Sequence, residues 1–347
     1  MPDTTWESMF LDPSDQRWMQ FIALQQHATL FHHPVWINLI AESYGHIPFI
    51  FVVVNKQGEI EAGVPLMKVK GTFNKKRWVS LPYTDHCAPL YKSPEALDFI
   101  TASIIDLGQE QKINNIELRW AYPAHPKIGQ VSNFVLSRLA LLPDEQQMIR
   151  RIKSNQYRHI RAAYQKGVRV EWGTDHEHLW TFYNLHIRTR RRLGVPVQPW
   201  SFFKKLGESI IRQGHGFILL AYKERVCLAA AIFLHWNRTL TYKYGASIEE
   251  ARYFQAMYPI LWTAIRWGGE RDFSELDLGR SDRDGHGLRT FKRRWGAEEI
   301  PLIYSILTQQ SSQFVRRKLI PVMRYIIQKS PVWVCRLSGE LLYRYIG

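Results

Sequence analysis

A lysine between two aromatic residues is the strongest candidate for a ligand contact in this sequence. Lys292 stands between Phe291 and Trp295 in the phrase Phe-Lys-Arg-Arg-Trp. Aromatic neighbours would restrict the flexible amine and lower the local dielectric constant, which strengthens its attraction to a pyrophosphate or carboxylate group. We therefore predict that Lys292 and Trp295 bind an anionic substrate. The alternative is a surface cation held on an aromatic anchor.

A polar, glycine-rich stretch precedes this lysine. Gly285 and Gly287 would let backbone amides of the loop Ser281–Leu288 approach an anion, and Arg280 adds positive charge. The loop lacks the lysine-serine ending of a P-loop and the strand-to-helix pattern of a dinucleotide site. It predicts a cradle for phosphate or carboxylate, with Arg280 and Ser281 as contacts, or alternatively a solvated surface loop. Asp277, among leucines of the preceding strand, is expected to have a structural or substrate-orienting role.

Proton transfer has candidates in two other places. Asp85 and His86 follow the strand-like run "RWVSLPY", where a loop could present either side chain to a cleft as a proton acceptor. Asp85 could instead cap a turn. In the run "TLTYKYG", alternation along a strand predicts that Tyr242 and Tyr244 share one face, where they could orient an acyl group or donate to an oxyanion. They could equally be core tyrosines.

A basic segment joins the two halves of the chain. Residues 149–166 carry a sparse apolar stripe at helical spacing, and arginines and lysines occupy the other faces. Arg158 and Arg161 are the members that we expect to hold an anionic acceptor substrate. Lys166 and Gly167 predict the end of this helix.

A further helix is expected after this segment. Residues 174–177, Thr-Asp-His-Glu, fit a capping box at its start. Helical spacing predicts an apolar face that is formed by Leu179, Phe182, Tyr183 and His186. Gly194, followed by Pro196, predicts its end.

The elements that position these residues recur with a spacing of about 160 to 168 residues. Each half contains a helix, two strands joined by a turn, a third strand, another helix and a further strand, which predicts α/β units with mixed sheets. We interpret the chain as an internal duplication with domains at residues 1–145 and 146–310, followed by a helical tail at 311–347. The runs are "FHHPVWINLIAESYG", "PFIFVVVN", "EIEAGVPLMKV", "RWVSLPY", "ALDFITASIIDLGQEQK" and "NNIELRW" in the first half, and "SFFKKLGESIIRQG", "GFILLAYK", "VCLAAAIFLHW", "TLTYKYG", "FQAMYPILWTAIRWGGERD" and "ELDLGR" in the second.

Composition narrows the class of protein. A chain of 347 residues with a formal net charge of +15 predicts a soluble two-domain protein with an anionic partner. Three widely spaced cysteines exclude a disulfide framework, and no catalytic or metal-binding sequence motif appears, so we expect no metal. The N-terminus lacks the features of a signal peptide, which predicts a cytoplasmic location.

The C-terminal segment, residues 311–347, is basic and amphipathic. Such a segment could lie on an anionic membrane surface, which would place the protein at the inner face of the cell membrane. A helix that packs back on the body of the protein is the alternative.

The order of these motifs resembles FemAB-type proteins, which contain tandem domains of the GCN5-related N-acetyltransferase (GNAT) fold. The runs "FHHPVWINLIAESYGH", "GVPLMKV", "VSLPY", "IELR", "YRHIRAAYQKGV", "FYNLHIRTRRRLGVP" and "LDLGRSDRDGHGLRTFKRRWG" carry the resemblance from Leu11 to about Leu307. It is similar to the armless members associated with bacterial exopolysaccharide and envelope systems. The resemblance implies transfer of an acyl or aminoacyl group to an amine, with Lys292 helping to hold a muropeptide-type precursor. In those enzymes an aspartate after a strand of the first domain has been considered as the general base, and Asp85 is its nearest equivalent by position.

Two features bear on the donor that this resemblance implies. No stretch has the heptad pattern of the long helical arm found in the best-known members. The turn with which acetyl-CoA-dependent relatives bind pyrophosphate is also missing from "PYTDHCAPLYKS" and "GASIEEARYFQ". We therefore expect no tightly bound cofactor, and rank aminoacyl-tRNA above acyl-CoA as the donor. A non-catalytic RNA-binding or membrane-surface scaffold is the alternative function, and DNA is not an expected partner.

Overall fold

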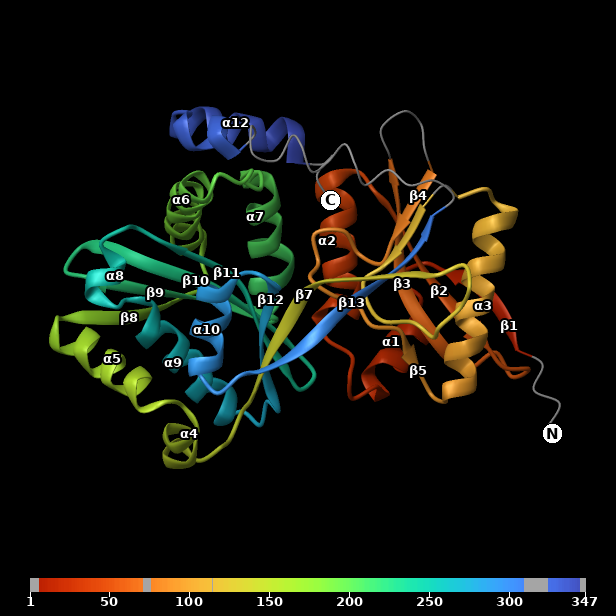
Figure 1. Cartoon of the computed structure of the whole chain (residues 1–347), viewed down its shortest axis with the longest axis horizontal. Helices are drawn as coiled ribbons and strands as arrows, with labels where there is room; N and C mark the ends of the chain where they lie inside the picture. Colours follow the sequence, from red (N-terminus) through yellow and green to blue (C-terminus); the bar gives the residue numbers. More distant parts are fainter. Residues whose placement is uncertain (1–5, 71–75, 114, 309–323, 344–347) are drawn as a thin grey trace. The chain divides into compact units, whose positions relative to one another are not determined.

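The computed structural model describes residues 6–70, 76–113, 115–308 and 324–343 (Figure 1). The chain divides into unit 1, which comprises Met1–Phe134 and Pro301–Ser312, and unit 2, which comprises Val135–Ile300 and Gln313–Ile346. The division falls inside two long strands, β7 (Gly129–Ala140) and β13 (Glu298–Thr308). The boundaries predicted at residues 145 and 310 lie shortly after these strands in the sequence.

Unit 1 is built on a mixed sheet with the strand order β1-β2-β3-β4-β6-β13. The pair β4–β6 is parallel, and the other neighbours in this order pair antiparallel. The predicted turn at Gln57-Gly58 joins β2 to β3, and Gly58 has a φ of 79°, which favours glycine. The strands are β1 (Glu7–Leu11), β2 (Ile47–Val54), β3 (Ile60–Lys70), β4 (Lys76–Val79), β5 (Leu90–Tyr91), which pairs with β3, and β6 (Asn115–Leu118).

Local sequence explains where the helices of unit 1 begin and end. The described helices are α1 (Gln16–Leu24), the short η1 (Leu30–His32), α2 (Pro34–Tyr44) and α3 (Pro94–Glu110). Proline occupies the first turn of α2 and α3, where the missing amide costs nothing, and Gly45 ends α2 with a φ of 70°. The helices at α2 and α3 and the strands β2, β3, β4 and β6 confirm the predicted elements, whereas β1, α1 and β7 were not predicted.

The strands of unit 2 form a second mixed stretch of sheet with the order β7-β12-β11-β10-β9-β8. The pair β11–β12 is parallel, and β8–β9, β9–β10 and β10–β11 are antiparallel. Beyond β7, a backbone hydrogen bond from Leu141 to Ser274 (3.0 Å) ties the chain to the start of β12. The remaining strands are β8 (Val168–Gly173), β9 (Gly216–Lys223), β10 (Val226–Trp236), β11 (Thr239–Ser247) and β12 (Glu275–Asp282).

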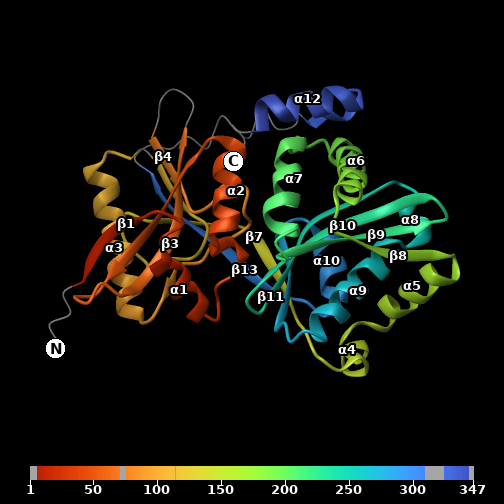
Figure 2. The ribbon, with the colours of Figure 1, turned by 180° about the vertical axis from the view of Figure 1, so that it is seen from behind.

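Helices cover both faces of this second sheet (Figures 1 and 2). The helix α9 packs on one face, and α6 and α7 pack on the other. Gly194 ends α6 as predicted, but the residue that caps its start is Asp175, one position later than the predicted capping box, because the Asp175 carboxylate accepts the backbone N–H of His178. The helices are α4 (Glu145–Arg151), α5 (Ser154–Gln165), α6 (His176–Leu193), α7 (Trp200–Leu206), which η3 (Gly207–Ile211) continues, α8 (Ala251–Phe254), α9 (Met257–Gly269) and α10 (His286–Arg294).

The described part of the C-terminal segment packs on unit 2. Residues 324–329 are helical, and α12 (Val332–Leu342) follows and lies against α6. Of the two alternatives for this segment, packing on the body is therefore confirmed for α12, while the predicted amphipathic stretch at 311–323 lies outside the described residues. Within the described ranges, no helix combines the length and the apolar character needed to span a membrane.

The two units share one order of elements. The series β1, α1, α2, β2, β3, β4, α3 and β6 in unit 1 corresponds to β8, α6, α7, β9, β10, β11, α9 and β12 in unit 2. Each unit contains antiparallel strand pairs together with a parallel pair, β4–β6 in unit 1 and β11–β12 in unit 2. The predicted class, two tandem α/β units with mixed sheets, is confirmed.

Candidate functional site

In unit 2 the parallel strands β11 and β12 separate after a short paired segment and leave an opening between them. Strands β11 and β12 pair only through Thr239–Thr241 and Glu275–Asp277. Both strands continue beyond these residues, β11 to Ser247 and β12 to Asp282, without further ladder pairs between them, whereas β11 stays paired with β10 to its end. The edge of β11 that faces this opening can therefore offer backbone N–H and C=O groups to a ligand.

A β-bulge in β11 corrects the prediction for the two tyrosines. Tyr242 and Tyr244 pair with Phe233 and Ile232, which are consecutive in β10, so Lys243 is the extra residue of the bulge. Because the bulge reverses the alternation of side chains, the tyrosines lie on opposite faces of the sheet. The Tyr242 hydroxyl lies 3.9 Å from a methionine sulfur of α9, and burial raises its pKa to about 12. Tyr244 packs against aromatic rings of α6 and α7.

A buried lysine and a buried carboxylate lock the end of β12. The Lys292 ammonium of α10 donates to the carbonyls of Gly279 (2.7 Å) and Arg280 (3.1 Å). The Asp277 carboxylate accepts the backbone N–H of Gly279 at 2.7 Å. Gly279 has a φ of 73°, a conformation that is costly for other residues, and both charged side chains are buried. This geometry confirms the expected structural role of Asp277 and shows that Lys292 shapes the strand end.

The aromatic neighbours of Lys292 do not enclose its ammonium group. Phe291 and Trp295 pack together and both contact Tyr258 of α9, with ring centroids 5.7 and 6.0 Å away. Trp295 is only 1% exposed. Residues 291 and 295 are four positions apart and lie on the same side of the helix, whereas residue 292 is rotated by about 100° from residue 291. Trp295 is therefore a core residue in this structure, and its position does not support the predicted contact with a substrate.

The glycine-rich loop is shorter than predicted. Strand β12 extends to Asp282 and α10 begins at His286, so Gly287 and Leu288 are helical. Arg289 is held by Glu299 through two hydrogen bonds of 3.0 and 2.8 Å. The remaining turn, residues 283–285, offers less backbone to an anion than the predicted cradle needs.

The predicted contacts on β12 differ in exposure. Arg280 is half-buried at the end of the strand. Ser281 is 3% exposed, and its hydroxyl has no hydrogen-bond partner among the described residues. A buried hydroxyl in this state can bind a ligand group at little cost, because it has no bond to give up.

Arg158 and Arg161 lie on the exposed side of α5. The buried side of this helix carries Gln156, Ile160 and Ala163, which confirms the amphipathic pattern. A backbone hydrogen bond of 3.1 Å from Lys153 to Arg294 links the start of α5 to the end of α10.

In unit 1 the loop after β4 encloses one predicted proton acceptor. His86 is only 2% exposed and packs between the rings of Phe31 and Trp120, with centroids 5.5 and 5.8 Å away. This corrects the prediction that the loop presents His86 to a cleft. Asp85 is half-buried, and its backbone carbonyl accepts the Tyr304 hydroxyl at 2.5 Å.

A buried histidine beside Tyr244 is a feature whose role the sequence did not reveal. His186, on the apolar face predicted for α6, is 3% exposed and lies 2.8 Å from the Gln198 side-chain oxygen through Nε2. Burial lowers its pKa to about 3, so the ring is neutral at pH 7. The helical spacing identified His186 as a core position, but its partner follows the turn at Gly194, where no periodic pattern applies.

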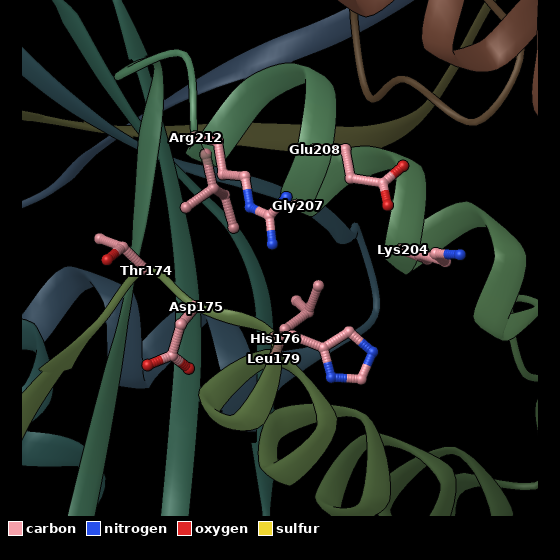
Figure 3. A pocket seen from close by; sticks show the side chains of 9 residues that line it. Thr174, Asp175, His176, Leu179, Lys204, Gly207, Glu208 and Arg212 are labelled. Atoms are coloured by element: carbon pink, nitrogen blue, oxygen red, sulfur yellow. The ribbon is translucent and has the colours of Figure 1, made fainter.

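A small surface hollow lies where α6 meets α7 and η3 (Figure 3). Asp175, His176, Lys204, Glu208 and Arg212 are among its lining residues. Asp175 is engaged as the cap of α6 and bonds His178 at 2.6 Å. In the part of the chain that the structure describes, no group of three or more His, Cys, Asp or Glu side chains is placed to hold a metal ion.

Comparison with known proteins identifies the fold of both units. Residues 150–293, which lie in unit 2, match the family model for the acetyltransferase (GNAT) domain. Similar solved structures include FemX (15% identity, TM-score 0.67, covering 92% of this chain and 100% of that chain). No curated protein matches the chain by sequence.

Two further solved structures support a tandem arrangement. One is the C-terminal domain of a protein named as a lysylphosphatidylglycerol synthetase from Agrobacterium fabrum (10% identity, TM-score 0.54, covering 90% of this chain and 95% of that chain). The other is a tandem GNAT protein from the clavulanic acid biosynthesis pathway (9% identity, TM-score 0.52, covering 89% of this chain and 100% of that chain). The chain therefore has a tandem GNAT fold of the acyltransferase type.

Proposed function

We propose that the chain transfers an acyl or aminoacyl group to an amine on an anionic cell-envelope precursor, and that the chemistry takes place in unit 2. The opening between β11 and β12 beyond Thr241 and Asp277 carries this proposal. Beyond these residues β11 and β12 form no ladder pairs with each other, and both strands lie within the segment that matches the acetyltransferase (GNAT) domain.

The reaction at this opening would form an amide. The amine nitrogen attacks the donor's carbonyl carbon, and the carbon–oxygen bond of an ester donor, or the carbon–sulfur bond of a thioester, breaks. Backbone N–H groups of β11 would stabilise the negative oxygen of the tetrahedral intermediate. The amine loses a proton to a base or to water, and the leaving oxygen or sulfur gains a proton.

The residues around β12 would position the substrates and take no part in bond making or breaking. Lys292 and Asp277 hold both the carbonyl and the amide of Gly279, so they fix the backbone at the mouth of the opening. Arg280 and Ser281 follow directly and are the proposed contacts for the acceptor's anionic groups. A displacement of this backbone by even an ångström would disturb the alignment of the reacting atoms.

The segment after β11 favours aminoacyl-tRNA over acyl-CoA as the donor. In this segment Glu249 and Glu250 are exposed, and Glu250 is the N-terminal cap residue of α8. Two carboxylates at this position would repel the negative charge of a pyrophosphate. The exposed Arg158 and Arg161 of α5 would instead attract the phosphates of RNA.

The acceptor class is inferred from charge and from similarity. A formal net charge of +15 favours an anionic acceptor. Similarity to FemX and to a protein named as a lysylphosphatidylglycerol synthetase suggests an envelope component, and a peptidoglycan or exopolysaccharide intermediate fits both observations.

Mass spectrometry of the envelope precursors and secreted polysaccharide tests this function. Cells with the wild-type protein, with the gene deleted and with Lys292→Met would be compared, and Lys204→Met, which changes an exposed lysine of α7, would serve as the control. We expect an acyl or aminoacyl mass increment that disappears in the deletion and Lys292→Met strains and persists in the control. Identical pools in all four strains would refute the proposal, and tRNA binding without turnover would then favour the scaffold alternative.

A further inference from the structure

The C-terminal helices of unit 2 have one face packed on α6 and another that is apolar and exposed. Among the residues of α12 whose exposure the structure describes, Cys335 and Gly339 are buried, as is Tyr343 just after the helix, and these positions recur every four residues. Trp333 and Leu337, which lie about half a turn away from this stripe, are 65% and 52% exposed. A surface helix usually has polar side chains on its outer side, but apolar side chains also line the outer side of α12.

The preceding helical stretch also exposes apolar side chains. Arg324 and Gln328 bond the carbonyls of Leu193 and Arg192 at 3.2 and 3.1 Å, which fixes one side of residues 324–329 on the end of α6. On the outer side, Tyr325 and Ile326 are 64% and 56% exposed. We name Tyr325, Ile326, Trp333 and Leu337 together the outer apolar face.

Basic residues accompany this face. Lys329 and Arg336 are exposed, and the Arg336 guanidinium lies 5.4 Å from the centre of the Trp180 ring. Across residues 311–347 the sequence has seven lysines and arginines and one acidic residue, Glu340. An apolar face that includes tryptophan and tyrosine and is flanked by cations matches the interface of an anionic bilayer, where aromatic rings lie at headgroup level.

We propose that the outer apolar face docks unit 2 on an anionic lipid membrane. Tyr325, Ile326, Trp333 and Leu337 would enter the headgroup and upper acyl region, and Lys329 and Arg336 would contact lipid phosphates. The described contacts of the helices with α6 and with Val197, whose carbonyl lies against Gly339, would transmit this anchoring to unit 2. This inference concerns location and is independent of the transferred group.

Flotation of the full-length protein with lipid vesicles tests the proposal. Vesicles of phosphatidylcholine alone would be compared with vesicles that also contain phosphatidylglycerol. We expect binding to the phosphatidylglycerol vesicles only, weakened by added salt because the lipid charge is screened. For Trp333→Ser combined with Leu337→Ser, loss of apolar burial should weaken binding roughly tenfold or more. Lys329→Glu should weaken it by a smaller factor of about 3 to 10.

A matched control separates docking from general loss of exposed apolar surface. Leu24 and Val226 are 83% and 55% exposed outside this face, and their replacement by serine should leave vesicle binding unchanged. The proposal is overturned if the wild-type protein does not float with the anionic vesicles, or if the Trp333/Leu337 variant floats as the wild type does. Self-association by light scattering that this variant abolishes, without vesicle binding, would assign the face to a second copy of the chain instead. Transfer to a water-soluble amine should be equal in the wild type and this variant, so this test is separate from that of the proposed function.

Discussion

Each unit contains one comparable pair of parallel strands, β4–β6 in unit 1 and β11–β12 in unit 2, and the two units differ at the ends of these pairs. In unit 1, β4 ends at Val79, and the loop that follows bonds to the end of β6. In unit 2, β11 continues as a strand past its last pair with β12. With the same order of elements, a loop bonds to the end of the second parallel strand in unit 1, whereas the two parallel strands of unit 2 separate beyond their last ladder pair.

The loop of unit 1 occupies the place that remains open in unit 2. The Ser80 amide donates to the Glu117 carbonyl at 2.8 Å, the Ser80 hydroxyl accepts the Arg119 amide at 2.7 Å, and the Cys87 amide donates to the Arg119 carbonyl at 3.2 Å. Leu81 and Tyr83 adopt positive φ angles of 59° and 61°, which are costly for such side chains. Tertiary hydrogen bonds stabilise this conformation. The loop of unit 1 therefore fills the position that corresponds to the proposed ligand site of unit 2.

The largest effect is expected from the residue that shapes the opening of unit 2. Lys292→Met keeps the aliphatic part of the side chain but removes the ammonium that holds the Gly279 and Arg280 carbonyls. We expect the transfer rate to fall by about 100-fold or more, as when a preorganised electrostatic group is lost. Single-turnover transfer by the purified protein, with folding checked by circular dichroism, measures this. A folded variant with the wild-type rate would remove Lys292 from the site.

The corresponding change in unit 1 should affect stability instead of chemistry. Burial raises the pKa of Glu117, but Arg119 and Arg77 outweigh this effect and hold it at about 2. Arg119→Met would leave the Glu117 carboxylate buried with one partner fewer, which should lower the free energy of unfolding by about 3 kcal/mol. Urea denaturation measures this. Arg17→Met, at a half-exposed pair with Asp15, should cost less than about 1 kcal/mol.

Acid should destabilise both units through buried histidines. Burial lowers the pKa of His32 in unit 1 to about 4 and that of His186 in unit 2 to about 3. Because the unfolded chain binds these protons near pH 6.5, stability is complete above that pH and is lost as the pH falls toward 4 and 3, by up to about 1.4 kcal/mol per pH unit for each group. Urea denaturation at pH 7 and pH 5 measures the loss. His186→Gln should reduce this pH dependence, and an unchanged dependence would argue against a neutral His186.

Two buried serines offer the smallest and sharpest contrast. Ser80→Ala removes the acceptor of the Arg119 amide and should destabilise the protein by about 1 to 2 kcal/mol. The Ser281 hydroxyl has no hydrogen-bond partner among the described residues, so Ser281→Ala should change the unfolding free energy by less than about 0.5 kcal/mol. If Ser281 contacts the acceptor, its variant should show a raised KM in the transfer assay. Equal destabilisation by both substitutions would contradict the view that this position is filled by a loop in unit 1 and open in unit 2.

Periodic segments of the sequence could be interpreted correctly from the chain alone. The apolar runs predicted β2, β3, β9 and β10, and Gly194 predicted the end of α6. Strand and helix periods depend on local geometry, so these features need no knowledge of distant residues. The strands β1 and β7 were missed because their short or polar runs become ordered through pairing with distant strands, and α1 was missed because it becomes ordered by packing on β3.

The residues of the candidate site were harder to place. Lys292 and Asp277 were recognised as unusual, yet their roles depend on Gly279, which the tertiary structure brings between them. One extra residue in β11 reversed the predicted face of Tyr242 relative to Tyr244, because a bulge changes every later position in the strand. Spacing along the chain contains no signal for such a bulge.

The sequence by itself determined the two α/β units, their order of elements, the strong positive charge and the short list of residues able to take part in chemistry. Only the tertiary structure decided which of these are buried, as with His86 and Trp295, and where backbone groups remain open between β11 and β12. The physical reason is that helix and strand patterns arise from interactions between near neighbours. Burial and strand pairing, in contrast, depend on contacts between residues far apart in the chain.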